Sequence, residues 1–464
     1  MPTPNVTRAH DGRLSRLSKF AFGAGDLGPA VVSAIQSLFL FAFLINVAGL
    51  RPAAAGTVLL IVKIWDAVND PLVGTLSDRT RSGRGRRRPW MLFGAIPFGV
   101  AFFLLWLVPP LSPTGLFWYY LIVLILLDTM TTVVNVPYAA LTAELTQDYD
   151  ERTNLNSYRF GFSILGSVTA AALHGIIVGR FEDVYVGHAV SAGIWAVVIS
   201  APFFFTVAFI REPERAPQSH REGLGFWAGI KIAFGNRPFV YVTLIYLLSW
   251  LTFQFIQNNL LLYVTYWVGA ADMFPFLVLT VQVSAIIFLL VWTWVSQKAG
   301  KTRVYFWGMS FFVAVLAGIY FLQPGQVGLL FVLGALAGVG VAIVYLVPWS
   351  MLPDVIELDE LETGQRREGV FYGFFVFLQK LGLSLGVWVS GLILDYAGYI
   401  RDAPGQATPV QPPDVLQALR VLVGPIPAVV LLLSFIVVAA YPITREKHAE
   451  IRARLAVRGG SGGS

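Results

Sequence analysis

The sequence predicts an all-α membrane protein with twelve transmembrane helices in two pseudo-symmetric six-helix halves. Three observations support this: a high apolar content, apolar blocks of membrane-spanning length, and a polar stretch near the middle of the chain. Hydrophobic residues occupy 56% of the 464 positions and charged residues only 13%, against about 25% charged in ordinary soluble domains. A soluble enzyme cannot bury so many long apolar blocks.

Each apolar block is long enough to cross a hydrocarbon core of about 30 Å as a helix. Lipid offers the backbone no hydrogen bonds, so a spanning segment is a helix or part of a closed barrel, and these continuous runs lack the alternation of barrel strands. We expect twelve spans, at residues 22–48, 56–77, 89–110, 115–143, 157–179, 188–210, 236–268, 274–296, 303–322, 327–352, 368–398 and 417–442.

A polar stretch from Arg211 to Lys231 separates the first six spans from the last six. We therefore expect a leading segment at 1–21, helical halves at 22–210 and 236–442, a central loop at 211–235, and a tail at 443–464 that ends in a GGSGGS linker. A short basic turn follows the second span of each half, GTLSDRTRSGRGRRRPW from Gly74 and WVSQKAGKTRVYFW from Trp294. This echo indicates two related halves with a site between them at mid-membrane.

The basic residues gather in loops on one side of the predicted membrane, which places both termini in the cytoplasm by the positive-inside rule. We expect a multi-pass protein of the inner (plasma) membrane, monomeric and surrounded by lipid. The net charge of +6 is explained by these loops, so we expect no nucleic-acid partner. The chain has no cysteine and no P-loop or other catalytic motif, so we expect neither an enzyme nor a cofactor.

Span two contains charges where lipid-compatible residues are expected. Lys63, Asp66 and Asp70 lie at i, i+3 and i+7, on one helical face, with Asn69 at its edge. Two carboxylates and an amide oxygen suit a hard cation such as Na⁺, by analogy with other oxygen-liganded ions, and paired carboxylates also suit a proton. The alternative is a salt bridge from Lys63 that only stabilises helix packing.

Other spans carry polar side chains that favour a solute site. Asp128, Thr132 and Asn135 form one stripe in span four, where interhelical hydrogen bonding is the alternative. Gln379 and Lys380 lie deep in span eleven, where a lysine needs a carboxylate, water or an anionic ligand. Further candidates are the aromatic Tyr345 and Trp349 of span ten and the amides Gln254, Gln257, Asn258 and Asn259 of span seven. For the aromatics the alternative is simple packing, and for some of the amides it is hydrogen bonding to neighbouring helices.

The motif from Ile64 to Pro71, IWDAVNDP, resembles the span-two signature of the glycoside–pentoside–hexuronide:cation symporters, the family of the melibiose permease, within the major facilitator superfamily. The turn that begins at Gly74, with Asp78 and Arg79, resembles the signature loop of that superfamily. Further matching segments are Lys19 to Gly28, Asp150 to Arg152, Tyr158-Arg159 and Pro353 to Glu357.

This resemblance implies symport of a small organic solute, most simply a sugar or glycoside, with Na⁺, H⁺ or Li⁺. The cation site would comprise Asp66, Asn69, Asp70 and Thr132, with Asp66 and Asp70 as the charged metal ligands. The solute site would include Arg159, Tyr345 and Lys380, and we add Asp128, Asn135 and Gln379 as candidates. Where that permease has acids or a tryptophan for its sugar, this chain has Ala30, Asn135 and Ala139, which argues against a galactoside.

A second resemblance points to another substrate. The segments Val136 to Thr142, His174 to Val178 and Trp349 to Ile356 are similar to the sodium-dependent lysophosphatidylcholine carriers of animals. The alternative function is therefore a sodium-coupled carrier of a lysophospholipid or other amphiphile.

Two further roles are expected. Asp78, Arg79 and Arg152 would form a cytoplasmic gate, in which Asp78 and Arg79 pair with charges among Asp150, Glu151 and Arg152. Lys380 would face Asp66 and Asp70 across the interface between the halves.

Overall fold

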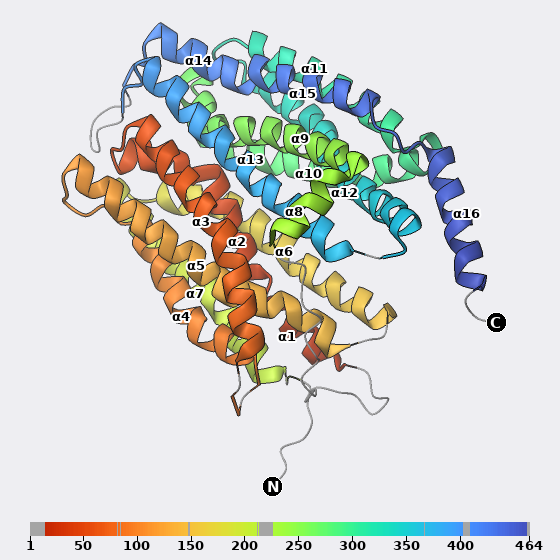
Figure 1. Ribbon diagram of the computed structural model, residues 1–464. Coiled ribbons are helices and arrows are strands. Elements are labelled where there is room, and N and C mark those ends of the chain that lie inside the picture. The colour runs from red at the N-terminus through yellow and green to blue at the C-terminus, as the bar shows by residue number, and fades with distance from the viewer. Residues whose placement is uncertain are drawn as a thin grey trace. The chain divides into compact units, whose positions relative to one another are not determined.

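The computed structural model of the chain consists of helices grouped in two compact units (Figure 1). Unit 1 comprises Met1–Ser219 with Ile400–Val410, and unit 2 comprises His220–Tyr399 with Gln411–Ser464. The structure describes residues 14–80, 82–83, 85–146, 149–210, 212, 226–365, 367–401 and 409–461.

The helices of unit 1 occupy the first part of the chain. They are α1 (Arg16–Ala24), α2 (Leu27–Ile35), the π-helical turns η1 (Gln36–Leu40) and η2 (Phe43–Val47), α3 (Pro52–Arg79), α4 (Arg88–Leu105), α5 (Pro113–Leu145), α6 (Tyr149–Val178) and α7 (Val184–Phe209). Several begin where the sequence has a start signal: Ser112 caps α5 ahead of Pro113, and Asp183 caps α7.

Unit 2 contains the remaining helices. They are α8 (Phe226–Gly235), α9 (Arg237–Leu262), the π-helical η3 (Tyr263–Val268), the 3₁₀ turn η4 (Ala271–Met273), α10 (Phe274–Ala299), α11 (Lys301–Phe321), α12 (Val327–Thr363), α13 (Glu368–Tyr396), α14 (Pro413–Val423), α15 (Pro425–Ala439) and α16 (Arg445–Ser461).

Eleven helical stretches among the described residues are long and apolar enough to cross a membrane. This confirms an all-α, multi-pass membrane protein. The first predicted span, 22–48, differs from the expected single helix, because it is divided among α1, α2, η1 and η2.

The junction between α1 and α2 packs on α5 and α6. Gly25 lies so close to Tyr138 of α5 that a Cβ at Gly25 would lie 2.5 Å from the tyrosine ring. The Tyr138 hydroxyl donates a hydrogen bond to the carbonyl of Phe22 at 2.6 Å. Asp26, the residue before α2, pairs with Arg159 of α6.

The two units repeat one packing pattern. In unit 1 the second helix (α3) packs on the fourth (α5), the third (α4) on the fourth and the sixth (α7), and the first (α2) on the fifth (α6). In unit 2, α10 packs on α12, α11 on α12 and α15, and α9 on α13. The order of neighbours is the same, so each unit is a six-helix repeat of one design.

In unit 2, one buried ion pair joins α11 to α12. Lys301 Nζ lies 2.6 Å from Asp354 Oδ2 and also donates to the carbonyl of Ser350. His448 of α16 lies 3.3 Å from Asp354 and 2.8 Å from Glu357. The carboxylate of Asp354 is only 8% exposed, so its charge depends on these partners.

We expect Lys301→Met to lower the free energy of unfolding by about 2 kcal/mol, because it leaves the buried Asp354 carboxylate without its main counter-charge. Thermal unfolding of the purified protein in detergent measures the effect. Lys298→Met is the matched control, since the Lys298 ammonium lies on the exposed Trp294 ring at 3.8 Å. Equal effects of the two substitutions would contradict this assignment.

Candidate functional site

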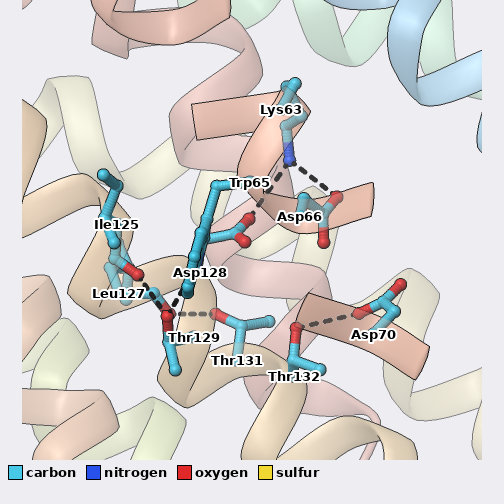
Figure 2. A network of polar contacts seen from close by, with 10 residues as sticks. All are labelled: Lys63, Trp65, Asp66, Asp70, Ile125, Leu127, Asp128, Thr129, Thr131 and Thr132. Atoms are coloured by element: carbon cyan, nitrogen blue, oxygen red, sulfur yellow. Dashed lines mark hydrogen bonds and ion pairs between the residues drawn. The ribbon is translucent and has the colours of Figure 1, made fainter. Parts of the chain in front are cut away.

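A stripe of polar side chains joins α3 to α5 inside unit 1 (Figure 2). The ammonium of Lys63 on α3 bridges two carboxylates, Asp66 Oδ2 on its own helix and Asp128 Oδ1 on α5, each at 3.5 Å. Both acids are shielded, with side chains 6% and 11% exposed, whereas Lys63 is 37% exposed. The Lys63 salt bridge considered as an alternative is therefore present, and it includes an acid from a second helix.

The second acid of α3 has a different partner. Thr132 of α5 donates its hydroxyl proton to Asp70 Oδ1 at 2.9 Å (Figure 2). Thr132 is buried, at 4% exposure. The predicted pair Asp70 and Thr132 thus lies together, one to two helical turns from the Lys63 bridge.

Asn69 supplies a buried amide beside these acids. It is 3% exposed, and among the described residues its Nδ2 has no hydrogen-bond partner. A buried polar atom without a partner is uncommon and costs about 1–3 kcal/mol. Rotation of the amide by 180° places its oxygen there instead, where a cation would satisfy it.

Carboxylate, amide and hydroxyl oxygens in the stripe are the donor types that suit hard cations. Within the described ranges, no cluster of three or more His, Asp or Glu side chains could hold a metal ion. The stripe instead brings together Asp66, Asn69 and Asp70 from α3 and Thr132 from α5, with Lys63 and Asp128 alongside.

Arg159, a predicted solute contact, lies elsewhere in unit 1 in an ion pair. Its Nε and Nη2 donate to the two oxygens of Asp26 at 2.8 and 3.1 Å, and its Nη1 donates to Thr142. The guanidinium also lies 5.0 Å from the ring centre of Tyr138. Three of its five donors are thus engaged, and its role in binding a solute stays a prediction. Asp26 was not predicted as its partner, although both are charges in apolar segments.

The predicted solute residues of unit 2 lie on α12 and α13. Tyr345 is 43% exposed and its ring meets Trp250 edge-on at 5.0 Å. Gln379 and Lys380 are half-buried on α13. Asn135, the remaining polar residue of the α5 stripe, is also half-buried. None of these positions excludes a solute contact, and the pairing of Lys380 with Asp66 and Asp70 stays a prediction.

Three amides of α9 are engaged in hydrogen bonds. Asn259 donates to Ser390 of α13 at 2.9 Å, and Gln254 donates to Asn258 within α9 at 2.7 Å. All three are buried. The bond of Asn259 is the interhelical kind that the sequence left open for these amides.

The structure describes part of the predicted gate, whose pairing stays a prediction. Asp78 accepts from Arg87 at 3.0 Å, because the turn between α3 and α4 brings the start of α4 back to the end of α3. Glu151, an expected partner, lies 3.6 Å from Lys19 and accepts from Thr146 at 2.9 Å. Arg79 is exposed. The side chains of Asp150 and Arg152 lie outside the described residues.

Comparison with known proteins identifies relatives along the whole chain. The chain is 39% identical to the uncharacterized symporter sll1374 of Synechocystis, over 96% of this chain and 97% of that protein. It is 30% identical to the sodium-dependent lysophosphatidylcholine symporter 1 of Gallus gallus, over 94% and 88%. The corresponding protein of Xenopus tropicalis is 29% identical, over 97% and 91%.

Solved structures share the fold at low sequence identity. The nucleoside transporter NupG superposes with a TM-score of 0.68 at 14% identity, covering 92% of this chain and all of that one. A bacterial homolog of the lysosomal transporter Spinster gives a TM-score of 0.65 at 12% identity, over 95% and 96%. The expected major facilitator fold is confirmed. The family model described as MFS/sugar transport protein matches residues 21–445, and the chain belongs to that family.

Proposed function

We propose that this chain is a secondary active symporter that couples a cation, Na⁺ in the first instance, to the movement of a small organic solute. The polar stripe between α3 and α5 is the observation that carries the proposal. Two relatives that are named symporters support it.

The charge of the stripe favours a cation. Three carboxylates, Asp66, Asp70 and Asp128, lie along it; Lys63 bridges Asp66 and Asp128, and Thr132 donates to Asp70. Charged side chains inside a membrane protein are costly and mark ion pathways. A cation held by Asp66, Asn69, Asp70 and Thr132 would add a counter-charge to the acids of α3. Li⁺ and H⁺ are the other ions that this chemistry admits.

Transport would follow from alternating access. Cation and solute bind one conformation more tightly than the other, and each raises the affinity for the other by the same factor. In the proposed orientation both termini lie in the cytoplasm, and the gradient of the ion across the inner (plasma) membrane drives accumulation of the solute.

The substrate class has two candidates. A sugar or glycoside follows from the family description. A lysophospholipid or similar amphiphile is favoured by two observations: Arg159 is engaged by Asp26, and Ala30, Asn135 and Ala139 stand where the melibiose permease-like pattern has its sugar contacts. The half-buried Lys380 ammonium suits the polar head of either class.

We expect Asp66→Asn and Asp70→Asn each to abolish sodium-stimulated uptake into proteoliposomes, because the amide keeps the volume and removes the charge. Asp183→Asn is the matched control, since Asp183 caps α7 at the surface and asparagine also caps helices. Sodium-stimulated uptake that survives in Asp66→Asn would remove Asp66 from the site.

The two substrate classes are separated by thermal shift. Purified protein is melted in detergent with a panel of glycosides and with lysophospholipids below their critical micelle concentration, each in NaCl and in choline chloride. We expect a stabilisation by lysophospholipid that is larger in NaCl, as linkage requires. Sodium-dependent stabilisation by a glycoside alone would assign the sugar instead.

Lys380→Ala should reduce coupled uptake at least about tenfold while Lys380→Arg retains part of it, if the positive charge on α13 contacts the polar head of the solute, since a charge-assisted hydrogen bond contributes about 1.5–3 kcal/mol. Uptake and the amount of protein in the membrane are measured together. Normal uptake by Lys380→Ala would show that the lysine only stabilises helix packing.

A further inference from the structure

A hydrogen bond between two neutral side chains crosses from α3 to α5 within the polar stripe. The indole Nε1–H of Trp65 donates to Thr129 Oγ1 at 2.9 Å (Figure 2). The hydroxyl of Thr129 in turn donates to the carbonyl of Ile125 at 2.7 Å, within α5. Because the hydroxyl proton of Thr129 is donated within α5, the Thr129 oxygen can accept the hydrogen bond from the indole N–H with a lone pair.

This contact lies between the two charged ones along both helices. In chain order, Lys63 meets Asp128, then Trp65 meets Thr129, then Asp70 meets Thr132. Both outer contacts use a carboxylate, and an incoming cation would use the one of Asp70. The middle contact uses no charged group, so it can persist in both the empty and the cation-bound site.

The bond fixes one end of the Trp65 ring. Trp65 is 37% exposed, so the protein does not enclose its ring on all sides. The neighbouring hydroxyl of Thr131, two residues along α5, donates instead to Leu127 of its own helix.

Register matters because the proposed ligands come from two helices. Asp66, Asn69 and Asp70 belong to α3 and Thr132 belongs to α5. A slip of one residue moves a helix by about 1.5 Å, whereas a binding constellation tolerates about 0.5 Å. A contact that holds the two helices in register therefore affects cation affinity without touching the cation.

We propose that the Trp65–Thr129 hydrogen bond is the positioning contact that sets α3 against α5 and so assembles the cation site. The inference rests on the proposed function, since it assumes that the stripe binds the coupling cation. Trp65 and Thr129 are positioning residues, not ligands.

The test measures sodium affinity directly. The melting temperature of the purified full-length protein is titrated with NaCl, with choline chloride holding the ionic strength constant. Thr129→Val removes the acceptor, Trp65→Phe removes the donor, and Thr129→Ser keeps the hydroxyl. Thr131→Val is the matched control, because it deletes the same group from the same helix where the group bonds only to its own backbone.

We expect Thr129→Val and Trp65→Phe each to raise the apparent sodium dissociation constant about three- to tenfold, the range for loss of one hydrogen bond. The double variant should be no weaker than either single one, because both remove the same contact. Thr129→Ser should restore affinity to within about twofold of the wild type, and Thr131→Val should leave it unchanged. A merely structural role would lower the melting temperature without sodium and leave the sodium dissociation constant as it was.

Other outcomes overturn the inference separately from the proposed function. If the wild-type protein responds to sodium and both Thr129→Val and Trp65→Phe have the wild-type sodium dissociation constant, the positioning role is refuted. The proposed symporter function is then unaffected. A failure of Thr129→Ser to recover affinity would have the same consequences. A wild-type protein that responds neither to NaCl nor to LiCl would overturn a metal-cation site in the stripe, and the positioning role with it, and would leave H⁺ as the coupling ion of the proposed symporter.

Discussion

A charge inside an apolar helix is tolerated only when a partner lies within reach, and this requirement governs how the helices of unit 1 associate. Lys63 draws α3 to α5 through Asp128, and Arg159 draws α6 to the break between α1 and α2 through Asp26. Hydrophobic burial cannot provide this specificity in lipid, because the surrounding chains are as apolar as the side chains. The polar contacts therefore select which helices are neighbours, and the same contacts place the candidate site.

The two units share a packing order but differ in the side chains through which their second and fourth helices meet. In unit 1 the second and fourth helices meet through charges. In unit 2 they are α10 and α12, where glycines of α12 receive side chains of α10: a Cβ on Gly338 would lie 2.6 Å from Ser284, and one on Gly334 would lie 2.7 Å from Leu277. The proposed cation ligands thus belong to one repeat, although the packing order is common to both.

The turns between the second and third helices show the same kind of divergence. In unit 1, Gly85 has φ +99° and Glu212, after the sixth helix, accepts from the amide of Arg87 at 3.0 Å. In unit 2, Gly300 has φ +88° and Arg445, after the sixth helix, donates to the carbonyl of Lys298. Each turn contains a glycine that permits positive φ. Each turn is also bonded by a charged residue that follows the sixth helix, and this residue is acidic in unit 1 and basic in unit 2.

Helical class, span positions and the polar stripes of the single helices, Lys63, Asp66 and Asp70 on one and Asp128, Thr132 and Asn135 on the other, were predictable from length, hydropathy and helical spacing, since these are properties of single helices. The grouping of Thr132 with Asp70 came from the family resemblance. Other cross-helix partners were not predictable, because one sequence does not state which helices touch. Asp26 with Arg159 and Asp78 with Arg87 depend on tertiary packing, as does the close approach of Tyr138 to Gly25 in the first span.

A cation that bound every conformation equally would couple nothing, however tightly it bound. The proposed ligands all lie in unit 1, on two helices held by three cross-helix contacts. A displacement of α3 along α5 would break the Trp65–Thr129 contact and separate Thr132 from Asp70, so the proposed site would bind the cation tightly only where this register is kept. A solute that favours one register favours the cation, and by reciprocity the cation favours that solute. Coupling then requires only that the solute contact α3 or α5, without any direct contact between solute and ion.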